Sequence, residues 1–453
     1  MNEQIKVRIE SIDAEAKGIA RIDGKTIFIN DVLPNEEVLI EIYKRKPTFD
    51  LARLIKIITP SIDRVEPLCP NFGNCGGCSL QHMEFNAQIL SKQKVLIDNL
   101  KHIGRVETQN VLQPIIGTPW GYRHRARMSA KYVFKKDSAL VGFREKGSPY
   151  VADMSECLVL PKHISDIIPN LRHLISQLSI KDKIPQIEVA IGDKINVLVF
   201  RVMEPLSSTD EEIVIAFVNE HNKTMLEKVQ ESNKLLQVWL QPKGLDSVYP
   251  FYPLNVPPLS YELKNFGIEM PYFPTEFTQV NPLINQEMID LALNLLDIQE
   301  DDEILDFFCG IGNFTLPMAT KAKHVFGIEG SSQLVARATQ NAKHNNLADK
   351  TNYMNADLFT IDSQWLKTLG KRNKWLIDPP RDGAAELIKS ITPDIAPSKI
   401  VYISCNPATL ARDAGVLVNT HGYQLVNAGV MNMFPHTSHV ESIAEFIKIT
   451  HRL

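Results

Sequence analysis

From about residue 280 onwards, short apolar runs alternate with segments of helical periodicity, beginning with a helical segment from Asn285 to Leu296. Parallel strands need long crossover connections, and helices usually provide them. The alternation therefore predicts an α/β domain, in which helices cover both faces of a parallel sheet. The expected strands are 303–308, 324–329, 352–354, 375–378 and 400–404, and two later runs, near 423–430 and 442–450, are expected to complete the sheet.

The first 60 residues have a different pattern, with five short β-like runs separated by turn residues such as Gly24 and Pro34-Asn35. Five short strands in so short a segment predict a small barrel of the OB type. Lys44-Arg45-Lys46, in the last hairpin loop, is either a phosphate contact or a solvated turn.

Between these two regions the pattern is mixed, which predicts a central α+β domain. An amphipathic helix is expected over 84–104, ended by Gly104, and paired strands are expected at 189–191 and 195–200. The expected domains are therefore 1–60, 61–270 and 271–453.

Composition narrows the class of protein. The chain has 453 residues, of which 44% are hydrophobic and 23% charged, as in ordinary globular proteins. It contains no apolar run of roughly 18 residues and begins without the pattern of a signal peptide, so we expect a cytoplasmic protein without a membrane span. Nothing in the sequence implies an obligate protein partner. The net charge of −4 means that global basicity cannot argue for nucleic acid.

Positive charge is local instead. Segment 120–147 carries a net charge of +6, with Trp, Tyr and Phe interleaved among its Lys and Arg residues. Cations and aromatic rings together suit a surface that binds phosphates and stacks bases, so RNA contact is favoured. The alternative is a half-buried strand with one solvated face, because Arg123, Arg125 and Arg127 alternate at period two.

Cys405 follows the fifth expected strand and precedes a helix with Pro407 in its first turn. A thiol in this place faces a helix N-terminus, where backbone amides and the helix dipole favour a thiolate. We therefore expect Cys405 to be a nucleophile.

A glycine pair in 310–312 follows the first strand, and Glu329, Asp357 and Asp378 follow the next three strands. Glycines let a ligand approach the backbone at this sheet edge, and a carboxylate after the second strand suits ribose hydroxyls. A dinucleotide site would have a third glycine where Thr315 stands. The pattern favours an adenosyl ligand without phosphates. S-adenosylmethionine is such a ligand, and nearby carboxylates would stabilise its sulfonium cation.

A nucleophilic cysteine beside a methyl donor suggests methylation of a pyrimidine carbon. Attack of a thiolate on C6 of uracil creates an enolate at C5, which accepts the methyl group. A base must then remove the C5 proton so that the thiol can leave, and Glu441 is our candidate. His436 and His439, nearby, are interpreted as loop residues rather than metal ligands.

The other five cysteines need their own account, because a disulfide framework is not expected in a reducing cytoplasm. Cys69, Cys75 and Cys78 lie in a glycine-rich loop that can wrap a metal, and Cys157 can serve as the fourth ligand. Four thiolates fit zinc or an iron–sulfur cluster, and the spacing does not choose between them. Cys309 is interpreted as a packing residue.

Four motifs carry a resemblance that spans nearly the whole chain. They are Ile403-Ser-Cys-Asn-Pro-Ala-Thr-Leu-Ala-Arg-Asp413, Leu305-Asp-Phe-Phe-Cys-Gly-Ile-Gly-Asn-Phe314, Asp378-Pro-Pro-Arg-Asp-Gly383 and Phe434-Pro-His-Thr437. The chain resembles the RNA uracil-C5 methyltransferase family, and most closely its RlmD-type branch, which acts on 23S ribosomal RNA. The resemblance implies a Rossmann-like S-adenosylmethionine methyltransferase domain, a TRAM domain over residues 1–60 and methylation of one specific uracil in 23S ribosomal RNA.

The resemblance also implies roles for individual residues. Cys405 would be the nucleophile and Glu441 the base. Cys69, Cys75, Cys78 and Cys157 would hold a 4Fe–4S cluster rather than zinc. The residues placed around S-adenosylmethionine are Gln279, Phe308, Asn313, Glu329, Asp357 and Asp378. The alternatives are methylation of another ribosomal or transfer RNA uracil, a cytosine-C5 methylase, and a non-catalytic RNA-binding factor of ribosome assembly.

Overall fold

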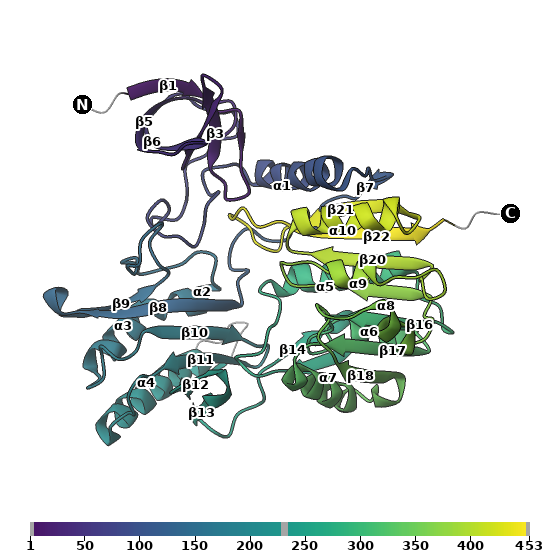
Figure 1. The fold of residues 1–453 in the computed structure, drawn as a ribbon. Coiled ribbons are helices and arrows are strands. Elements are labelled where there is room, and N and C mark those ends of the chain that lie inside the picture. The colour runs from purple at the N-terminus through teal and green to yellow at the C-terminus, as the bar shows by residue number, and fades with distance from the viewer. Residues whose placement is uncertain (1–3, 228–233, 450–453) are drawn as a thin grey trace.

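The computed structural model of the chain describes residues 4–227 and 234–449, and Figure 1 shows them as three bodies. A barrel stands at the top of that view, a central α+β body lies below it, and a large sheet with its helices lies beside both. Within the described residues, no helix is both long and apolar enough to cross a membrane.

The barrel is a six-stranded sheet in the order β1-β5-β6-β4-β3-β2. All five predicted strands are present, β2 is an additional short one, and β4 pairs parallel with β6. Ile27, Ile29, Val38 and Ile40 form its buried interior. The strands are β1 (Gln4–Arg8), β2 (Ser11–Ile12), β3 (Gly18–Ile22), β4 (Lys25–Ile29), β5 (Glu37–Arg45) and β6 (Phe49–Thr59).

The central body is a second six-stranded sheet, in the order β13-β12-β11-β10-β8-β9. Its β10 and β11 are the predicted strand pair, and α3 and α4 pack on it. The elements are β8 (Arg125–Val133), β9 (Ser138–Gly142), α2 (Lys162–Ser165), α3 (Ile168–Gln177), β10 (Gln186–Ile191), β11 (Ile195–Arg201), α4 (Ser208–Glu227), β12 (Leu235–Gln241) and β13 (Tyr249–Tyr252).

The third body is an eight-stranded sheet in the order β18-β17-β16-β19-β20-β22-β21-β7. All seven predicted strands are present, and those from β18 to β20 are parallel, while β22 runs antiparallel between β20 and β21. The strands are β16 (Glu303–Phe307), β17 (His324–Glu329), β18 (Thr351–Asn355), β19 (Lys374–Ile377), β20 (Lys399–Ser404), β21 (Tyr423–Met431) and β22 (Glu441–Lys448).

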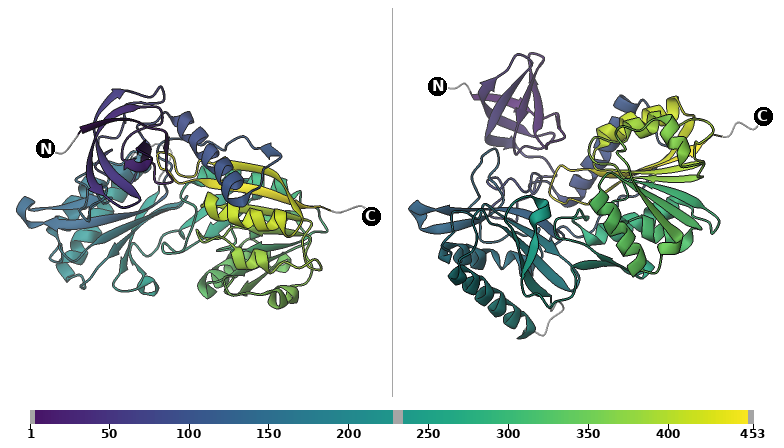
Figure 2. Two further views of the ribbon diagram at one scale, coloured as in Figure 1. Left: turned by 45° about the horizontal axis from the view of Figure 1, so that its top comes forward. Right: turned by 60° about the horizontal axis from the view of Figure 1, so that its bottom comes forward.

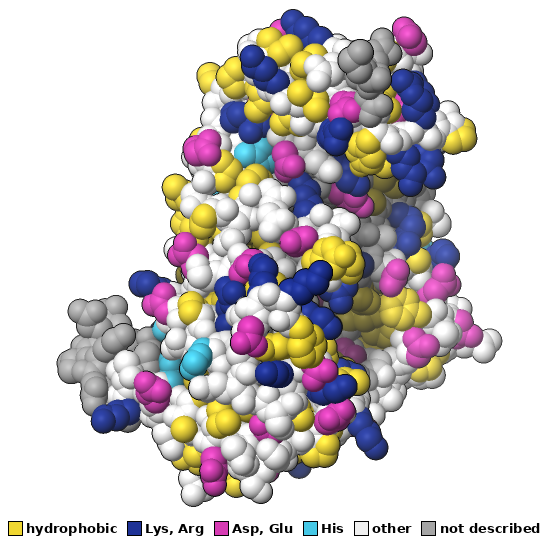
Figure 3. Space-filling model, turned by 90° about the vertical axis from the view of Figure 1, so that its left-hand side faces the viewer, with side chains coloured by type: hydrophobic (Ala, Val, Ile, Leu, Met, Phe, Trp, Pro, Cys, Tyr) yellow, Lys and Arg dark blue, Asp and Glu magenta, His cyan; other side chains and the backbone are white. Residues whose placement is uncertain are grey.

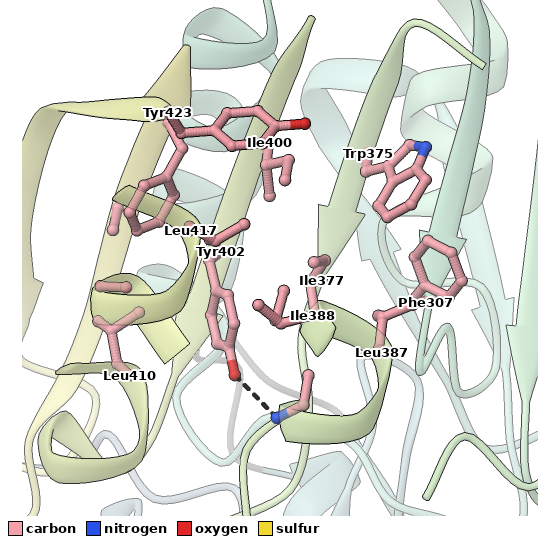
Figure 4. Packing of buried hydrophobic residues seen from close by; sticks show 14 of the residues in the cluster. Phe307, Trp375, Ile377, Leu387, Ile388, Ile400, Tyr402, Leu410, Leu417 and Tyr423 are labelled. Atoms are coloured by element: carbon pink, nitrogen blue, oxygen red, sulfur yellow. Dashed lines mark hydrogen bonds between the residues drawn. The ribbon is translucent and has the colours of Figure 1, made fainter. Parts of the chain in front are cut away.

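Helices cover both faces of this sheet, as the alternation predicts. On one face, Trp375, Tyr402 and Phe307 pack with α9 and α10 (Figure 4). The Tyr402 hydroxyl donates to Asp413 at 2.7 Å and accepts the Ala384 N–H at 3.1 Å, so this large buried ring has its polar atom satisfied. The helices are α5 (Pro282–Leu296), α6 (Thr315–Lys321), α7 (Ser332–His344), α8 (Ser363–Thr368), α9 (Ala385–Lys389) and α10 (Pro407–Asn419).

The predicted boundary between central and C-terminal domains needs correction. The predicted helix at 84–104 is α1 (Phe85–Asn99) followed by a π-helical turn, η1 (Leu100–Gly104), and both pack on α10 of the C-terminal body. Both views in Figure 2 keep α1 beside α10. The next segment, β7 (Asn110–Val111), pairs with β21 at the edge of the eight-stranded sheet.

A hairpin of β14 (Ser260–Leu263) and β15 (Ile268–Pro271) also joins this body, because the Glu269 N–H donates to the Asn345 side chain beyond α7. The C-terminal body therefore takes segments from both ends of the range 61–270. Sequence patterns miss this because the contacts are far apart in the sequence, by 76 residues for the hairpin and by more than 300 for β7.

Candidate active site

A cavity of about 540 Å³ opens at the carboxyl ends of the parallel strands. The structure brings all eight residues predicted for catalysis and methyl-donor binding to its wall. These residues are Gln279, Phe308, Asn313, Glu329, Asp357, Asp378, Cys405 and Glu441. Because the carboxyl ends of parallel strands meet at one edge, residues spread over 160 positions of sequence line one site.

The loop after β16 shapes the floor of this cavity. Phe308, Gly310 and Gly312 all have positive φ, of 63°, 55° and 93°. Only the two glycines adopt this conformation without strain, so Phe308 is held in an unfavourable conformation at the cavity wall. The Glu329 carboxylate accepts the Gly310 N–H at 3.1 Å and the Ser331 N–H at 2.9 Å, which fixes the acid against the loop.

Asn313 is fixed by a polar network rather than by the glycine loop. Its side-chain oxygen accepts hydrogen bonds from the Tyr261 hydroxyl at 2.8 Å and from Asn285 at 3.1 Å, and its amide donates back to Asn285 at 2.8 Å. Tyr261 comes from β14 and Asn285 from α5, so the hairpin outside the parallel sheet contributes to the site.

The opposite part of the cavity is apolar and aromatic. The rings of Phe308 and Phe359 lie 5.7 Å apart, and Leu334 and Leu358 line the same wall. Asp357 holds the Phe359 backbone by accepting its N–H at 3.0 Å. Aromatic and aliphatic walls beside carboxylates suit a flat ring carrying a polar sugar.

Cys405 lies between the end of β20 and the start of α10, as predicted. Asn406 caps the helix by accepting the Ala408 N–H at 3.1 Å, and its amide donates to the Arg381 carbonyl at 3.0 Å. Thr409 donates to the same carbonyl at 3.2 Å. These hydrogen bonds join the loop that carries Cys405 to the loop that follows β19.

The expectation that the helix N-terminus stabilises a Cys405 thiolate is wrong for this structure. Burial, and then the Glu441 and Asp378 carboxyls, raise the pKa of Cys405 to about 11, and the Arg381 cation lowers it only in part. Desolvation and two nearby carboxyls outweigh the amides because a thiolate here would be partly buried beside like charge.

Glu441 is brought to Cys405 by strand register. Antiparallel pairing of β20 with β22 sets Ser404 opposite Ser442, and the same register continued by one residue sets Cys405 opposite Glu441. Glu441 is 4% exposed, and burial, with the Asp378 carboxyl, raises its pKa well above the usual range. Burial also raises the pKa of Asp378 to about 7. Groups with pKa values raised this way are suited to holding and transferring protons near neutral pH.

Sequence reasoning missed several residues of this wall. Tyr261 and Phe359 line it, and Arg381, Phe434 and His439 surround Cys405 and Glu441. His439, interpreted above as a loop residue, lies 3.4 Å from the Arg381 guanidinium and packs on the Phe434 ring. Arg381 and Phe434 lie within the motifs quoted above, whereas no sequence motif pointed to Tyr261.

A second cavity, of about 470 Å³, meets the first at Cys405, Arg381 and His439. Its walls come from the barrel loop at 12–15, the cysteine-rich loop at 76–80, α1, and residues 437–440. Cys405 therefore stands between the cavity at the sheet edge and a groove lined by the barrel, the cysteine-rich loop and the C-terminal body.

Comparison with known proteins identifies the family. The chain is 54% identical over 440 residues to the 23S rRNA (uracil(1939)-C(5))-methyltransferase RlmD of Chromobacterium violaceum, covering 97% of this chain and 84% of that one. It is 50% identical to the RlmD protein of Nitrosospira multiformis, over 98% of both chains. The chain belongs to the RlmD family of RNA uracil-C5 methyltransferases.

Family models and a solved structure agree with this assignment. Residues 267–448 match the model for tRNA (Uracil-5-)-methyltransferase, and residues 2–55 match the TRAM domain. The crystal structure of Pyrococcus abyssi tRNA (uracil-54, C5)-methyltransferase, in complex with S-adenosyl-L-homocysteine, aligns with a TM-score of 0.72 at 22% identity, over 98% of this chain and 100% of that one. The RlmD-family chain thus has this fold, including the predicted N-terminal barrel.

The four cysteines predicted as ligands surround a small cavity of about 20 Å³ in this RlmD-family chain. Cys75 accepts the Gly77 N–H at 3.4 Å, and burial raises the pKa of Cys78 to about 12 and of Cys157 to about 11. In the part of the chain that the structure describes, no three Cys, His, Asp or Glu side chains are grouped as a metal site. The four cysteines that line this cavity are all sulfur donors, and that chemistry suits zinc or an iron–sulfur cluster alike.

The basic segment at 120–147 is not the uniform RNA surface that its composition predicts. Arg125 is a structural residue that donates to the carbonyls of Pro274 and Glu276, and Arg127 pairs with Glu188. Tyr122 and Tyr132 are buried in the central core. The exposed Lys and Arg residues of this segment are Arg127, Lys131, Lys135, Lys136 and Arg144, of which Lys136 pairs with Asp153. Phe134 is exposed as well.

Proposed function

We propose that this protein transfers a methyl group from S-adenosylmethionine to C5 of one uracil in 23S ribosomal RNA, the nucleotide that the relatives' names give as uracil 1939. The observation that carries this proposal is the juxtaposition of Cys405 and Glu441 in one cavity with the strand-end carboxylates. This arrangement supplies a nucleophile, a base and a cation-binding wall at one place.

The residues present fit S-adenosylmethionine. Glu329, after β17, would bind the ribose hydroxyls, and Phe308 with Phe359 would enclose the adenine. Gln279, Asn313, Asp357 and Asp378 complete the wall that holds the donor. When bound, S-adenosylmethionine supplies an electrophilic methyl group and brings a positive charge beside Asp378, which favours the ionised forms of the neighbouring carboxyls.

Cys405 and Glu441 carry the covalent steps on the RNA base. The Cys405 thiol gives its proton to the Asp378 carboxylate, which the positive charge of the bound donor keeps ionised, and the sulfur bonds to C6 of uracil. The electron pair of the C5–C6 bond moves into an enolate, whose C5 takes the methyl group as the donor's sulfur–methyl bond breaks. Glu441 then removes the proton from C5, the C5–C6 double bond re-forms, and the thiolate leaves. The raised pKa of Glu441 suits this step, because a strong carboxylate base is needed against a carbon acid.

The RNA would enter through the groove on the other side of Cys405. A base inside a helix cannot reach a buried thiol, so the target uracil must be extruded, at a cost of a few kcal/mol. Figure 3 shows Lys and Arg side chains around a hollow with a hydrophobic floor on the face of the molecule that carries the barrel. The exposed cations and the barrel would bind flanking phosphates. This proposal requires no protein partner and fits action in the cytoplasm.

Transfer of labelled methyl groups to 23S ribosomal RNA fragments tests the reaction. We expect turnover with the wild type, no turnover with Cys405→Ala, and a covalent protein–RNA adduct on denaturing gels with Glu441→Gln. Both variants should still bind S-adenosylhomocysteine, which shows that the fold is intact. Methylation by Cys405→Ala would remove this cysteine from the mechanism, and RNA binding without turnover by the wild type would favour the ribosome-assembly alternative.

The choice of RNA is tested separately. The archaeal neighbour shares the fold and is named for a transfer RNA uracil, so the fold by itself does not select the substrate. We expect 23S fragments containing the uracil to be methylated, and transfer RNA transcripts to be methylated at least a hundredfold more slowly. Analysis of the product nucleoside also separates 5-methyluridine from 5-methylcytidine.

We further propose that Cys69, Cys75, Cys78 and Cys157 hold a 4Fe–4S cluster. Their all-sulfur donor set and their convergence on one cavity support it. When bound, the cluster would keep the four sulfurs as thiolates and brace the loop, as metal binding braces other small folds. Protein purified without oxygen should have a broad visible absorbance that Cys78→Ser removes, whereas a colourless protein with one equivalent of zinc would contradict the cluster.

A further inference from the structure

The loop that leads to Glu441 is held by segments from a distant part of the sequence. It consists of residues 432–440, between β21 and β22, and it carries Phe434 and His439 to the wall of the active-site cavity. The side chains that hold it belong to the cysteine-rich loop, to α1 and to the segment before β8, all more than 300 residues earlier in the chain.

Gln88 of α1 contacts both this loop and the cysteine-rich segment before α1. Its side-chain oxygen accepts the His436 N–H at 2.9 Å, and its amide lies 3.2 Å from Nδ1 of the same histidine. The amide also donates to the carbonyls of Leu80 and Met83, at 3.1 and 2.8 Å. Gln88 is fully buried, so one side chain joins the end of the cysteine-rich loop to the loop before Glu441.

Lys92, one turn further along α1, holds the start of the same loop. Its ammonium group donates to the Asn432 side chain and to the Phe434 carbonyl, both at 2.8 Å. The side chain is 3% exposed, and both acceptors are neutral oxygens. Burying a cation without a carboxylate is unfavourable, so this lysine is a poor choice for stability alone.

The cysteine-rich loop contributes directly. The backbone N–H groups of Ser79 and Leu80, immediately after Cys78, both donate to the His436 carbonyl at 2.9 Å. The Ser79 hydroxyl accepts the Ser438 N–H at 3.1 Å. His436 itself has a φ of 64° and stacks on Trp120, with ring centroids 3.9 Å apart. A residue in that conformation needs such surrounding contacts to stay there.

We propose that Gln88 and Lys92 are positioning residues for the base step, and that they act with Ser79 as a clamp that couples the cysteine-rich loop to Glu441. The inference rests on the proposed function, because it assigns the clamp to proton removal from C5. Glu441 is the first residue of β22. The strand therefore fixes the backbone that follows Glu441, and the clamped loop fixes the backbone that precedes it. Release of the clamp frees His439, Phe434 and the Glu441 carboxyl, while Cys405 stays fixed by β20 and α10.

The clamp predicts a specific kinetic signature. Gln88→Met and Lys92→Met should lower kcat at least tenfold and change KM for S-adenosylmethionine less than threefold. Because attack and methyl transfer precede proton removal, the covalent protein–RNA adduct should accumulate during turnover in both variants, as in Glu441→Gln. Lys92→Arg, which keeps the charge and the donors, should recover part of the rate. The matched controls are Gln93→Met and Lys94→Met on the same helix, where Lys94 is exposed and pairs with Asp98.

A second measurement keeps the clamp testable independently of the reaction. Hydrogen–deuterium exchange of the peptide covering 432–440 should accelerate at least tenfold in Gln88→Met and in the milder Ser79→Ala, and should not change in Lys94→Met. Unchanged exchange would overturn the clamp. Faster exchange and lower kcat without extra adduct would overturn its role in proton removal. If Glu441→Gln itself traps no adduct, the proposed base step fails, and the exchange result alone then decides whether the clamp exists.

Discussion

Burial sets the protonation of the side chains at the sheet edge. Cys405, Asp378 and Glu441 all have raised pKa values because desolvation disfavours their charged forms and the carboxyls oppose one another. The Cys405 thiol therefore carries its proton in the free protein. Before substrates bind, the Asp378 and Glu441 carboxyls also hold their protons more tightly than exposed carboxyls do.

Alkylation of Cys405 tests this protonation state. Thiolates react and thiols do not, so a pKa of about 11 predicts that carbamidomethylation of Cys405 rises about tenfold per pH unit between pH 7 and pH 10. Peptide mass spectrometry measures the rate at this residue, with exposed glutathione as the reference for reagent chemistry. A rate that reaches its plateau by pH 8 would mean that the helix N-terminus lowers the pKa of Cys405 by more than burial and the carboxyls raise it.

Asp306 provides a pH-dependent stability test. It is fully buried in β16, and one carboxyl oxygen accepts a hydrogen bond from Thr315, whereas the other has no partner among the described residues. Burial raises the pKa of Asp306 to about 8. The unfolded pKa is about 3.9, so the folded state binds the proton more tightly. Its contribution to stability is fully present below about pH 4 and is lost as the pH rises towards 8.

Asp306→Asn removes this dependence. The advantage of the variant over the wild type in free energy of unfolding should grow by on the order of 1 to 3 kcal/mol between pH 5 and pH 8. Thermal unfolding without ligand at both pH values measures it, and the exposed Asp301→Asn serves as the control. The same difference at pH 5 and pH 8 would contradict the assignment.

At the scale of elements, close approach between α10 and the turn η1 attaches α1 to the C-terminal body. A Cβ at Gly104 would lie 2.5 Å from the Ala411 carbonyl oxygen, and one at Gly415 would lie 2.8 Å from the Gly104 oxygen. Two glycines facing each other allow the backbones to approach closely. Gly104 thus ends the helix as predicted, but its place against α10 is the stronger reason for a glycine.

Gly104→Ala should therefore destabilise the protein by about 1 to 3 kcal/mol, since an extra methyl group in a packed interface forces backbone shifts. Denaturant unfolding measures the change. Lys101→Ala, at an exposed position in the same turn, should change stability by less than about 0.5 kcal/mol. Stabilisation by Gly104→Ala would show that helix propensity outweighs the packing contact.

At the scale of the whole molecule, the barrel, the cysteine-rich loop and the C-terminal body meet around the groove beside Cys405. Lys146 of the central body pairs with Asp31 of the barrel at 2.7 Å, and the Gly76 N–H of the cysteine-rich loop donates to the Arg144 carbonyl at 2.8 Å. The cysteine-rich loop thus contacts the central body as well as the loop before Glu441. A bound RNA would touch surfaces from separate parts of the chain at once.

RNA binding should depend on the exposed cations near β9 and not on the paired ones. Replacing Lys131, Lys135 and Arg144 by Gln should weaken binding and reduce the slope of log K against log salt by up to about 2, at about 0.7 for each lost phosphate contact. Filter binding from low to moderate salt measures the slope. Lys367, Lys371 and Lys389, on the α8–α9 side, form the charge-matched control triple. An unchanged slope would place the RNA elsewhere.

Local patterns predicted those parts of the molecule in which neighbouring residues share one environment. The parallel strands and the carboxylates at their ends followed from periodicity and position, because such strands end at one edge whatever lies between them. The nucleophile and the candidate base were named from Cys405 at a strand end and Glu441 at the start of β22, and the two meet in one cavity. The strands of the barrel followed from the β-like runs of residues 1–60.

Tertiary structure alone decided what depends on distant contacts. Whether Cys405 is a thiol or a thiolate depends on burial and on two carboxyls, Glu441 and Asp378, from two other strands, which no local motif shows. The same holds for Arg125, which lies in the segment favoured for RNA contact and holds the loop before Gln279, and for the attachment of α1 and β7 to the C-terminal body. Sequence position determines which chemical groups reach the sheet edge, whereas desolvation and long-range packing determine their charge and their partners.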